Sequence, residues 1–115
     1  MTPTEILLRR AENLLIITFD DGGTASLPAE YLRVESPSAE VQGHSPAQRR
    51  LVPGKRQVGI TKIEPTGNYA IRLIFSDGHD TGIFSWDYLH LLGAEYPARW
   101  AKYLQDIEAA GLSRG

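Results

Sequence analysis

The sequence predicts a small α+β domain with antiparallel strands, assembled from two similar strand–hairpin–helix halves and closed by a C-terminal helix. Three observations support this prediction: stretches of alternating apolar residues, two Asp-Gly turns, and a Tyr-Leu pair at a similar distance after each turn. Because 115 residues is an ordinary domain length, residues 1–115 are expected to form a single domain.

The first half contains two predicted strands and a short helix. After a short apolar run at 6–9, Leu15, Ile17 and Phe19 fall on one face of a strand, because successive strand side chains point to opposite sides. The Asp-Gly turn at 20–23 favours a hairpin, whose return strand is 24–27. Pro28 suits a helix start, so residues 29–33 are expected to be helical.

The second half repeats this plan. Residues 58–64 are strand-like, a turn is predicted at 65–68, and Ile71, Leu73 and Phe75 alternate as their counterparts do. A second Asp-Gly turn at 76–79 precedes a return strand at 81–84. The segment from Phe19 to Leu32 matches the segment from Phe75 to Leu89 with one residue inserted, which favours an internal repeat over two unrelated hairpins.

Two helices complete the prediction. Ser85 is a good N-cap for a helix to about residue 92, which is expected to stop near Gly93. A last helix starts near Pro97, presents an apolar stripe of Trp100, Leu104 and Ile107, and stops near 111. Residues 112–115 are expected to fray.

The segment 35–57 between the halves has no sustained periodicity and is predicted to be a long loop of a functional kind. It contains the only local excess of charge, a basic cluster that includes Arg49 and Arg50. These two residues are candidates for binding an acidic partner. Nucleic-acid binding is not expected, because no recognition helix or stacking platform accompanies the cluster.

Composition excludes several classes of function. The chain has 42% hydrophobic and 23% charged residues, a net charge of −2 and no cysteine, which is typical of a cytoplasmic globular domain. Without cysteine there is no disulfide, thiolate metal site or cysteine nucleophile. No apolar run is long enough to span a membrane, no secretory signal is visible, and no nucleotide-binding or nucleophile-elbow motif occurs.

The second Asp-Gly turn carries the most suggestive residues. His79 lies between Asp77 and Asp80, and a histidine flanked by carboxylates can hold a proton near neutrality or bind a metal. A local structural role for His79 is the alternative. His44 could join it only through the fold. Trp86 either packs the sheet against the helix or contributes to a partner-binding surface.

The words Tyr31-Leu-Arg33, Ser36-Pro-Ser-Ala-Glu40, Asp77-Gly-His79 and Gly82-Ile-Phe-Ser-Trp-Asp-Tyr-Leu89 resemble a known family. The chain is similar, from about residue 3 to 103, to the gamma-butyrobetaine hydroxylase-like N-terminal domain family, as a small stand-alone bacterial member of unknown function. The resemblance implies a small α+β domain, in agreement with the patterns above. In the hydroxylases this domain precedes a separate iron- and 2-oxoglutarate-dependent catalytic domain, so hydroxylase activity is not expected of these residues.

The resemblance also implies a metal-site difference. In those hydroxylases the domain holds a structural zinc through three cysteines and a histidine. At the matching positions this chain has Ser36, Ser38, Val41 and His79. Hydroxyl and isopropyl groups do not replace thiolates, so that zinc site is expected to be lost. Similar domains are also attached to P-loop iron–sulfur carrier ATPases, which implies an accessory role.

The function expected from the sequence is therefore that of a non-catalytic protein-interaction or accessory module, linked to iron–sulfur or iron-oxygenase proteins. The alternative is a metal-binding domain that uses His79, His44 and nearby carboxylates to hold iron, manganese or zinc. No resident cofactor is predicted, a small enzyme ranks last, and self-association is left open. The expected partner-binding residues are Asp77, His79, Asp80, Trp86, Arg49 and Arg50.

Overall fold

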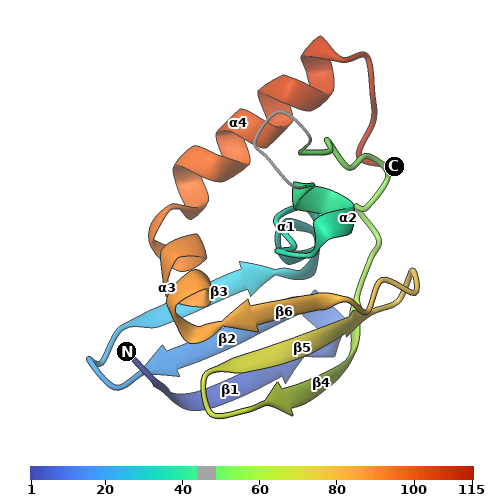
Figure 1. The fold of residues 1–115 in the computed structure, drawn as a ribbon. Helices are drawn as coiled ribbons and strands as arrows, with labels where there is room; N and C mark the ends of the chain where they lie inside the picture. Colours follow the sequence, from blue (N-terminus) through green and yellow to red (C-terminus); the bar gives the residue numbers. More distant parts are fainter. Residues whose placement is uncertain (44–48) are drawn as a thin grey trace.

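Residues 1–43 and 49–115, which the computed structural model describes, form two three-stranded antiparallel sheets with the helices gathered on one side of the strands (Figure 1). The first sheet has the order β1 (Pro3–Arg9), β2 (Leu14–Phe19) and β3 (Thr24–Pro28). The second has the order β4 (Ile60–Thr66), β5 (Ala70–Phe75) and β6 (Gly82–Ser85). The predicted α+β class and its two similar halves are confirmed.

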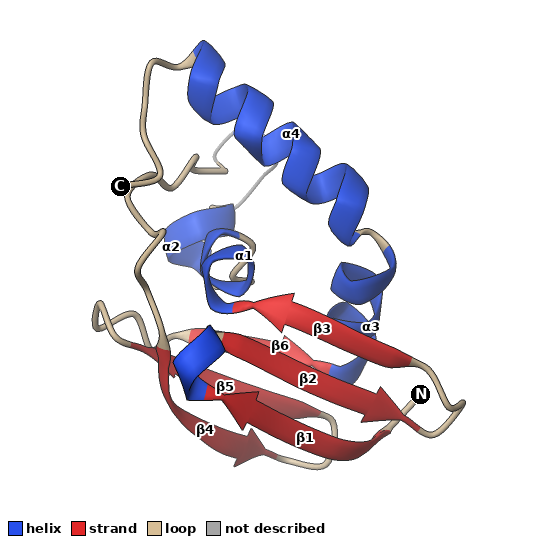
Figure 2. Ribbon diagram, turned by 180° about the vertical axis from the view of Figure 1, so that it is seen from behind, coloured by secondary structure: helices blue, strands red, loops and turns tan. Residues whose placement is uncertain are grey.

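Each sheet leads into a helix. A 3-10 turn (Arg10–Glu12) joins β1 to β2, α1 (Ala29–Val34) follows β3, and α3 (Trp86–Ala94) follows β6. The four-residue α2 (Ala39–Gln42) lies within the segment predicted to be a loop, and α4 (Tyr96–Ala109) ends the fold. Figure 2 shows α4 running obliquely above the sheets, with α1 and α2 between its C-terminal half and the strands.

Both sheets contribute to one core. The alternating residues Leu15, Ile17 and Phe19 of β2 and Leu73 and Phe75 of β5 are buried together, as their periodicity predicts. Burial of each such side chain stabilises the fold by about 1.5–3 kcal/mol. The shared core explains why neither hairpin needs to be stable alone.

The two Asp-Gly turns have the same backbone geometry. Gly22 (φ 85°) and Gly78 (φ 91°) both lie in the left-handed region, where glycine is favoured. The amides of Phe19 and Phe75 donate to the carbonyls of Gly23 and His79, at 2.8 and 2.9 Å. The repeat seen in the sequence therefore extends to individual hydrogen bonds.

The repeated tyrosines bind the halves to each other reciprocally. The Tyr31 hydroxyl donates to the carbonyl of Leu92 at 2.8 Å, and the Tyr88 hydroxyl donates to that of Glu35 at 2.6 Å. Each acceptor lies four residues after the other half's tyrosine, so the two bonds are equivalent. The repeated tyrosine therefore has a tertiary role, because its hydroxyl binds the other half, and the Asp-Gly turns do not need this contact.

Two close contacts occupy equivalent positions in the two halves. A Cβ on Gly93 would lie 2.7 Å from the Cβ of Ala25, and a Cβ on Gly82 would lie 2.6 Å from Ser36 Oγ. Each contact therefore contains one glycine, in α3 in one case and in β6 in the other. Helix α3 ends at Ala94, next to the stop predicted near Gly93, and the missing side chain of Gly93 allows close packing on β3.

Other differences from the predicted pattern also have local causes. Strand β4 continues through Pro65 into the predicted turn, which β4 can accommodate because it lies at the sheet edge. On α4 the inner positions are Tyr103 and Ile107, with Trp100 partly buried, whereas Leu104 is 37% exposed. Tyr103 packs with Val34 and Ile107 in a second buried cluster, and its hydroxyl donates to the Val52 carbonyl at 2.6 Å.

The end of the chain makes specific contacts. Arg114, in the segment expected to fray, donates two hydrogen bonds to the carboxylate of buried Glu30 at 2.7 and 2.9 Å and lies 5.3 Å from the Trp100 ring centre. The amides of Gly54 and Arg56 donate to the carbonyls of Ser113 and Arg114. None of the helices in the described residues has the length and apolar composition to cross a bilayer.

Candidate functional site

His79 lies buried in a polar cluster supplied by two distant segments. Its Nε2 is 2.8 Å from the hydroxyl of fully buried Ser36 and 3.4 Å from that of Ser38. Its Nδ1 is 3.2 Å from a carboxylate oxygen of Glu40. The Glu40 carboxylate also accepts a hydrogen bond from the Thr81 hydroxyl at 3.1 Å. We call Ser36, Ser38, Glu40 and His79 the His79 cluster; it ties segment 36–40 to the β5–β6 turn.

The hydrogen-bond partners of His79 fit a neutral histidine with its proton on Nδ1. A carboxylate only accepts, so Nδ1 carries the proton directed at Glu40 and Nε2 accepts from the serine hydroxyls. Burial lowers the pKa of His79, and the positive charge of Arg33 lowers it further against the opposing effect of Glu40. His79 therefore holds the two segments together through hydrogen bonds on both ring nitrogens.

The structural zinc of the resembling hydroxylases does not fit these residues. The histidine nitrogen on the side of Ser36 and Ser38 is engaged by their hydroxyls, and the side chain of Val41, which is buried, has no donor atom. A Cβ on Gly82 would already come too close to Ser36 Oγ, so the cluster is tightly packed. Across 1–43 and 49–115, no group of three or more His, Cys, Asp or Glu residues could hold a metal ion.

The order of contacts Ser36–His79–Glu40 is that of a serine hydrolase triad, with Nε2 facing the hydroxyl and Nδ1 facing the carboxylate. A nucleophile must, however, be reachable by a substrate carbonyl. Ser36 is fully buried, and it does not line either of the two described hollows. The arrangement therefore serves as a structural hydrogen-bond chain.

Asp77 supports the same turn from the other side. Its carboxylate accepts from Arg33 Nε at 2.8 Å and from the Lys55 ammonium at 2.7 Å, and it also accepts from the His79 amide at 3.1 Å. Burial opposes ionisation, yet the hydrogen bonds from Lys55, the His79 amide and Arg33 lower the pKa of Asp77 to about 2. In the other half, His90 is equivalent to Arg33 and Asp21 is equivalent to Asp77, and the side chains of His90 and Asp21 lie 3.8 Å apart.

The remaining sequence candidates lie apart from this cluster or outside the described residues. Asp80 is exposed and its carbonyl accepts from Arg72. The Trp86 indole donates to the Asn68 carbonyl at 2.9 Å, at the start of α3. His44 lies outside the described residues, so its distance from His79 is not defined by the structure.

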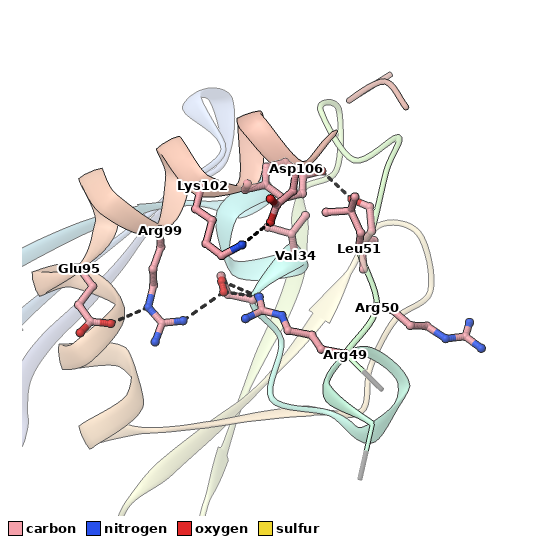
Figure 3. Close-up of a pocket in the computed structure, with 11 residues that line it drawn as sticks. Val34, Arg49, Arg50, Leu51, Glu95, Arg99, Lys102 and Asp106 are labelled. Atoms are coloured by element: carbon pink, nitrogen blue, oxygen red, sulfur yellow. Dashed lines mark hydrogen bonds and ion pairs between the residues drawn. The ribbon is translucent and has the colours of Figure 1, made fainter. Parts of the chain in front are cut away.

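Arg49 and Arg50 line a hollow of about 510 Å³ between the end of α1, the segment 49–52 and α4 (Figure 3). We call it the α1–α4 hollow. Its apolar part is formed by Val34, Leu51, Val52 and Tyr103. Its charged residues are Glu35, Arg49, Arg50, Glu95, Arg99, Lys102 and Asp106.

A buried carboxylate organises the charged side of this hollow. Glu35 accepts from one terminal nitrogen of Arg49 at 2.5 and 2.8 Å and from Arg99 at 3.2 Å, and Arg99 also donates to Glu95 at 2.7 Å. Figure 3 shows this chain crossing the hollow, with Arg50 extending away from it. The Glu35 side chain is only 6% exposed, so it fixes both guanidinium groups from below.

Sequence reasoning identified Arg49 and Arg50 but missed Glu35 and Arg99. Glu35 is the first residue of the predicted loop, and Arg99 lies outside the apolar stripe predicted for the last helix. A weak signal existed: Glu35 follows Tyr31 by four residues, and Leu92 occupies the equivalent position after Tyr88. A charged residue at the equivalent of a buried leucine indicates a carboxylate with buried partners.

Comparisons with known proteins agree with the fold. A model of the family described as "Gamma-butyrobetaine hydroxylase-like, N-terminal" matches residues 6–90. One solution NMR structure is 46% identical to this chain with a TM-score of 0.86, and the match covers 98% of this chain and 89% of the other. A second solution NMR structure is 45% identical with a TM-score of 0.85, and the match covers 98% of this chain and 84% of the other. A crystal structure from Acidithiobacillus ferrooxidans, described as a DUF971 protein with unknown function, is 40% identical with a TM-score of 0.70 and covers 82% and 94%. No curated protein matches.

Proposed function

The chain belongs to the gamma-butyrobetaine hydroxylase-like N-terminal family, and we propose that it is a non-catalytic protein-interaction module. The observation behind this proposal is the α1–α4 hollow. It combines apolar area with charged groups that are already held in place, which is typical of binding surfaces.

The chemistry of the lining favours binding over catalysis. Glu35 is buried, and its carboxylate oxygens are already engaged by two arginines. Burial raises the pKa of Tyr103 to about 12, and its hydroxyl is engaged by the Val52 carbonyl. The described lining thus contains no nucleophile–base pair of the kind that catalysis requires.

Isolation of a binding partner tests this proposal. The tagged protein would be used to isolate a partner from native extract, and the purified pair would then be combined and measured by sedimentation. A defined complex of constant stoichiometry supports the proposal. Iron–sulfur and iron-oxygenase proteins, the classes implied by the family, would be tried first. The absence of any such complex, together with measured turnover of a substrate, would reject it.

A further inference from the structure

We propose that the α1–α4 hollow binds an acidic peptide segment of the partner. A carboxylate of that segment binds the guanidinium groups of Arg49 and Arg99, and a neighbouring apolar side chain packs on Leu51 and Tyr103. This inference rests on the proposed function and specifies the chemistry of the partner.

The charge distribution around the hollow favours an anionic ligand. The lining has four cationic side chains, Arg49, Arg50, Arg99 and Lys102, against three carboxylates, which leaves an excess of one positive charge. The Glu35 carboxylate is buried between Arg49 and Arg99, whereas Glu95 pairs with Arg99 and Asp106 pairs with Lys102 on the solvent side. The Lys102 side chain is 74% exposed and that of Arg49 is 42% exposed. A local excess of positive charge in a protein of net charge −2 selects acidic segments.

The guanidinium groups retain donors for such a ligand. Arg49 uses one terminal nitrogen for both oxygens of Glu35, and Arg99 uses Nε and one terminal nitrogen. An arginine offers five N–H donors in a planar arrangement, so both side chains can bind a second carboxylate while they still hold Glu35. Among the residues described, no hydrogen bond is assigned to Arg49 Nε or to the second terminal nitrogen of Arg99.

The hollow is also preorganised. The amide of Arg50 donates to the Val41 carbonyl at 2.7 Å, and the Tyr103 hydroxyl fixes Val52, so both ends of segment 49–52 are tied to helices. Holding the donors in place before binding reduces the entropy that a complex would lose. The apolar residues Leu51 and Val52 are only partly buried, so they can cover one apolar side chain of the peptide.

The experiment uses two blocked hexapeptides, one alternating glutamate with leucine and one alternating glutamine with leucine. Each is titrated into isotope-labelled full-length protein and followed by NMR. We expect the acidic peptide to shift the amides of residues 34–35, 49–52 and 95–106, and to bind at least tenfold more tightly than the glutamine peptide. The affinity should fall with added salt, because the contacts are ionic.

Two variants test the site. Arg49→Gln removes a guanidinium that also stabilises Glu35. Lys102→Glu reverses an exposed charge that pairs with Asp106 and not with the buried Glu35. Both should weaken binding of the acidic peptide at least tenfold. Lys62→Glu is the matched control and should leave the affinity unchanged, because Lys62 is 67% exposed and also pairs with a surface carboxylate, on β4.

The proposal is overturned if the two peptides bind equally, if the shifts lie elsewhere, or if Lys102→Glu binds as the unaltered protein does. Binding of a mixed-sequence oligonucleotide at the hollow in preference to the acidic peptide would also overturn it. A native partner that binds both variants undiminished would retain the module and reject the hollow. Acidic-peptide binding without any native partner, together with measured turnover of a substrate, would support the ligand chemistry and reject the proposed function.

Discussion

Replacing Gly82 with alanine tests the packing of the His79 cluster most directly. The added Cβ would lie 2.6 Å from Ser36 Oγ and 3.0 Å from a ring carbon of Phe84, and Ser36 is fully buried. Overpacking of this kind costs about 1–3 kcal/mol. If Ser36 turns away, its hydrogen bond to His79 is lost as well, at about 1 kcal/mol. We therefore expect Gly82→Ala to lower the free energy of unfolding by about 2–4 kcal/mol.

A double-mutant cycle distinguishes the clash from a general effect of alanine. Ser36→Ala removes the obstructing oxygen and should cost about 1–2 kcal/mol alone, because His79 loses its nearer hydrogen bond. The double variant should be destabilised by at least 1 kcal/mol less than the sum of the single variants, because the clash disappears. Urea unfolding followed by tryptophan fluorescence gives all four values. Additive effects, or a cost for Gly82→Ala below about 0.5 kcal/mol, would refute the reasoning.

Three further predictions follow from the same contacts. Gly93→Ala should lower the melting temperature although alanine favours helix, because the new Cβ would lie 2.7 Å from that of Ala25. Adding Ala25→Gly should restore most of the loss by removing the atom with which the new Cβ clashes. A Gly93→Ala variant as stable as the parent would contradict this prediction. Because the pKa of His79 is lower in the folded than in the unfolded chain, the unfolded chain binds more protons, and the free energy of unfolding should fall as the pH drops through about 6.5. Denaturant titrations should show that this fall disappears in His79→Gln and persists in His90→Gln. Zinc, iron(II) or manganese should leave the melting temperature of the parent protein unchanged. Zinc should raise the melting temperature of the triple variant S36C, S38C and V41C, which carries three thiols near His79. Stabilisation of the parent protein by zinc would contradict the structural role of the cluster.

The sequence was sufficient for the elements whose signals are local. Alternation placed Leu15, Ile17 and Phe19 on the buried face of β2, and Ser85 caps α3, with its hydroxyl accepting from the Tyr88 amide at 3.1 Å. The Asp-Gly turns were equally predictable, because the positive φ of Gly22 and Gly78 is a property of the turn itself. These features depend on residues a few positions apart.

The sequence failed where a residue's role depends on a distant neighbour. Gly93 marks the helix end that the sequence predicts, but its packing position against Ala25 was not predicted. Leu104 has the spacing of a core residue, yet Tyr103 lies on the buried face of α4, packed with Val34 and hydrogen-bonded to Val52. Neither contact produces a periodic pattern in the sequence from which it could be predicted.

The candidate sites divide along the same line. The sequence by itself determined that the chain has no thiolate, that two hairpins repeat, and that Arg49, Arg50 and His79 are chemically conspicuous. Only the tertiary structure placed His79 against Ser36 and Glu40, 43 and 39 residues away, and set Glu35 beneath Arg49 and Arg99. The physical reason is that burial and hydrogen-bond partners, which decide whether a polar side chain is structural or free to bind, are set by chain segments that meet only when the two halves share one core.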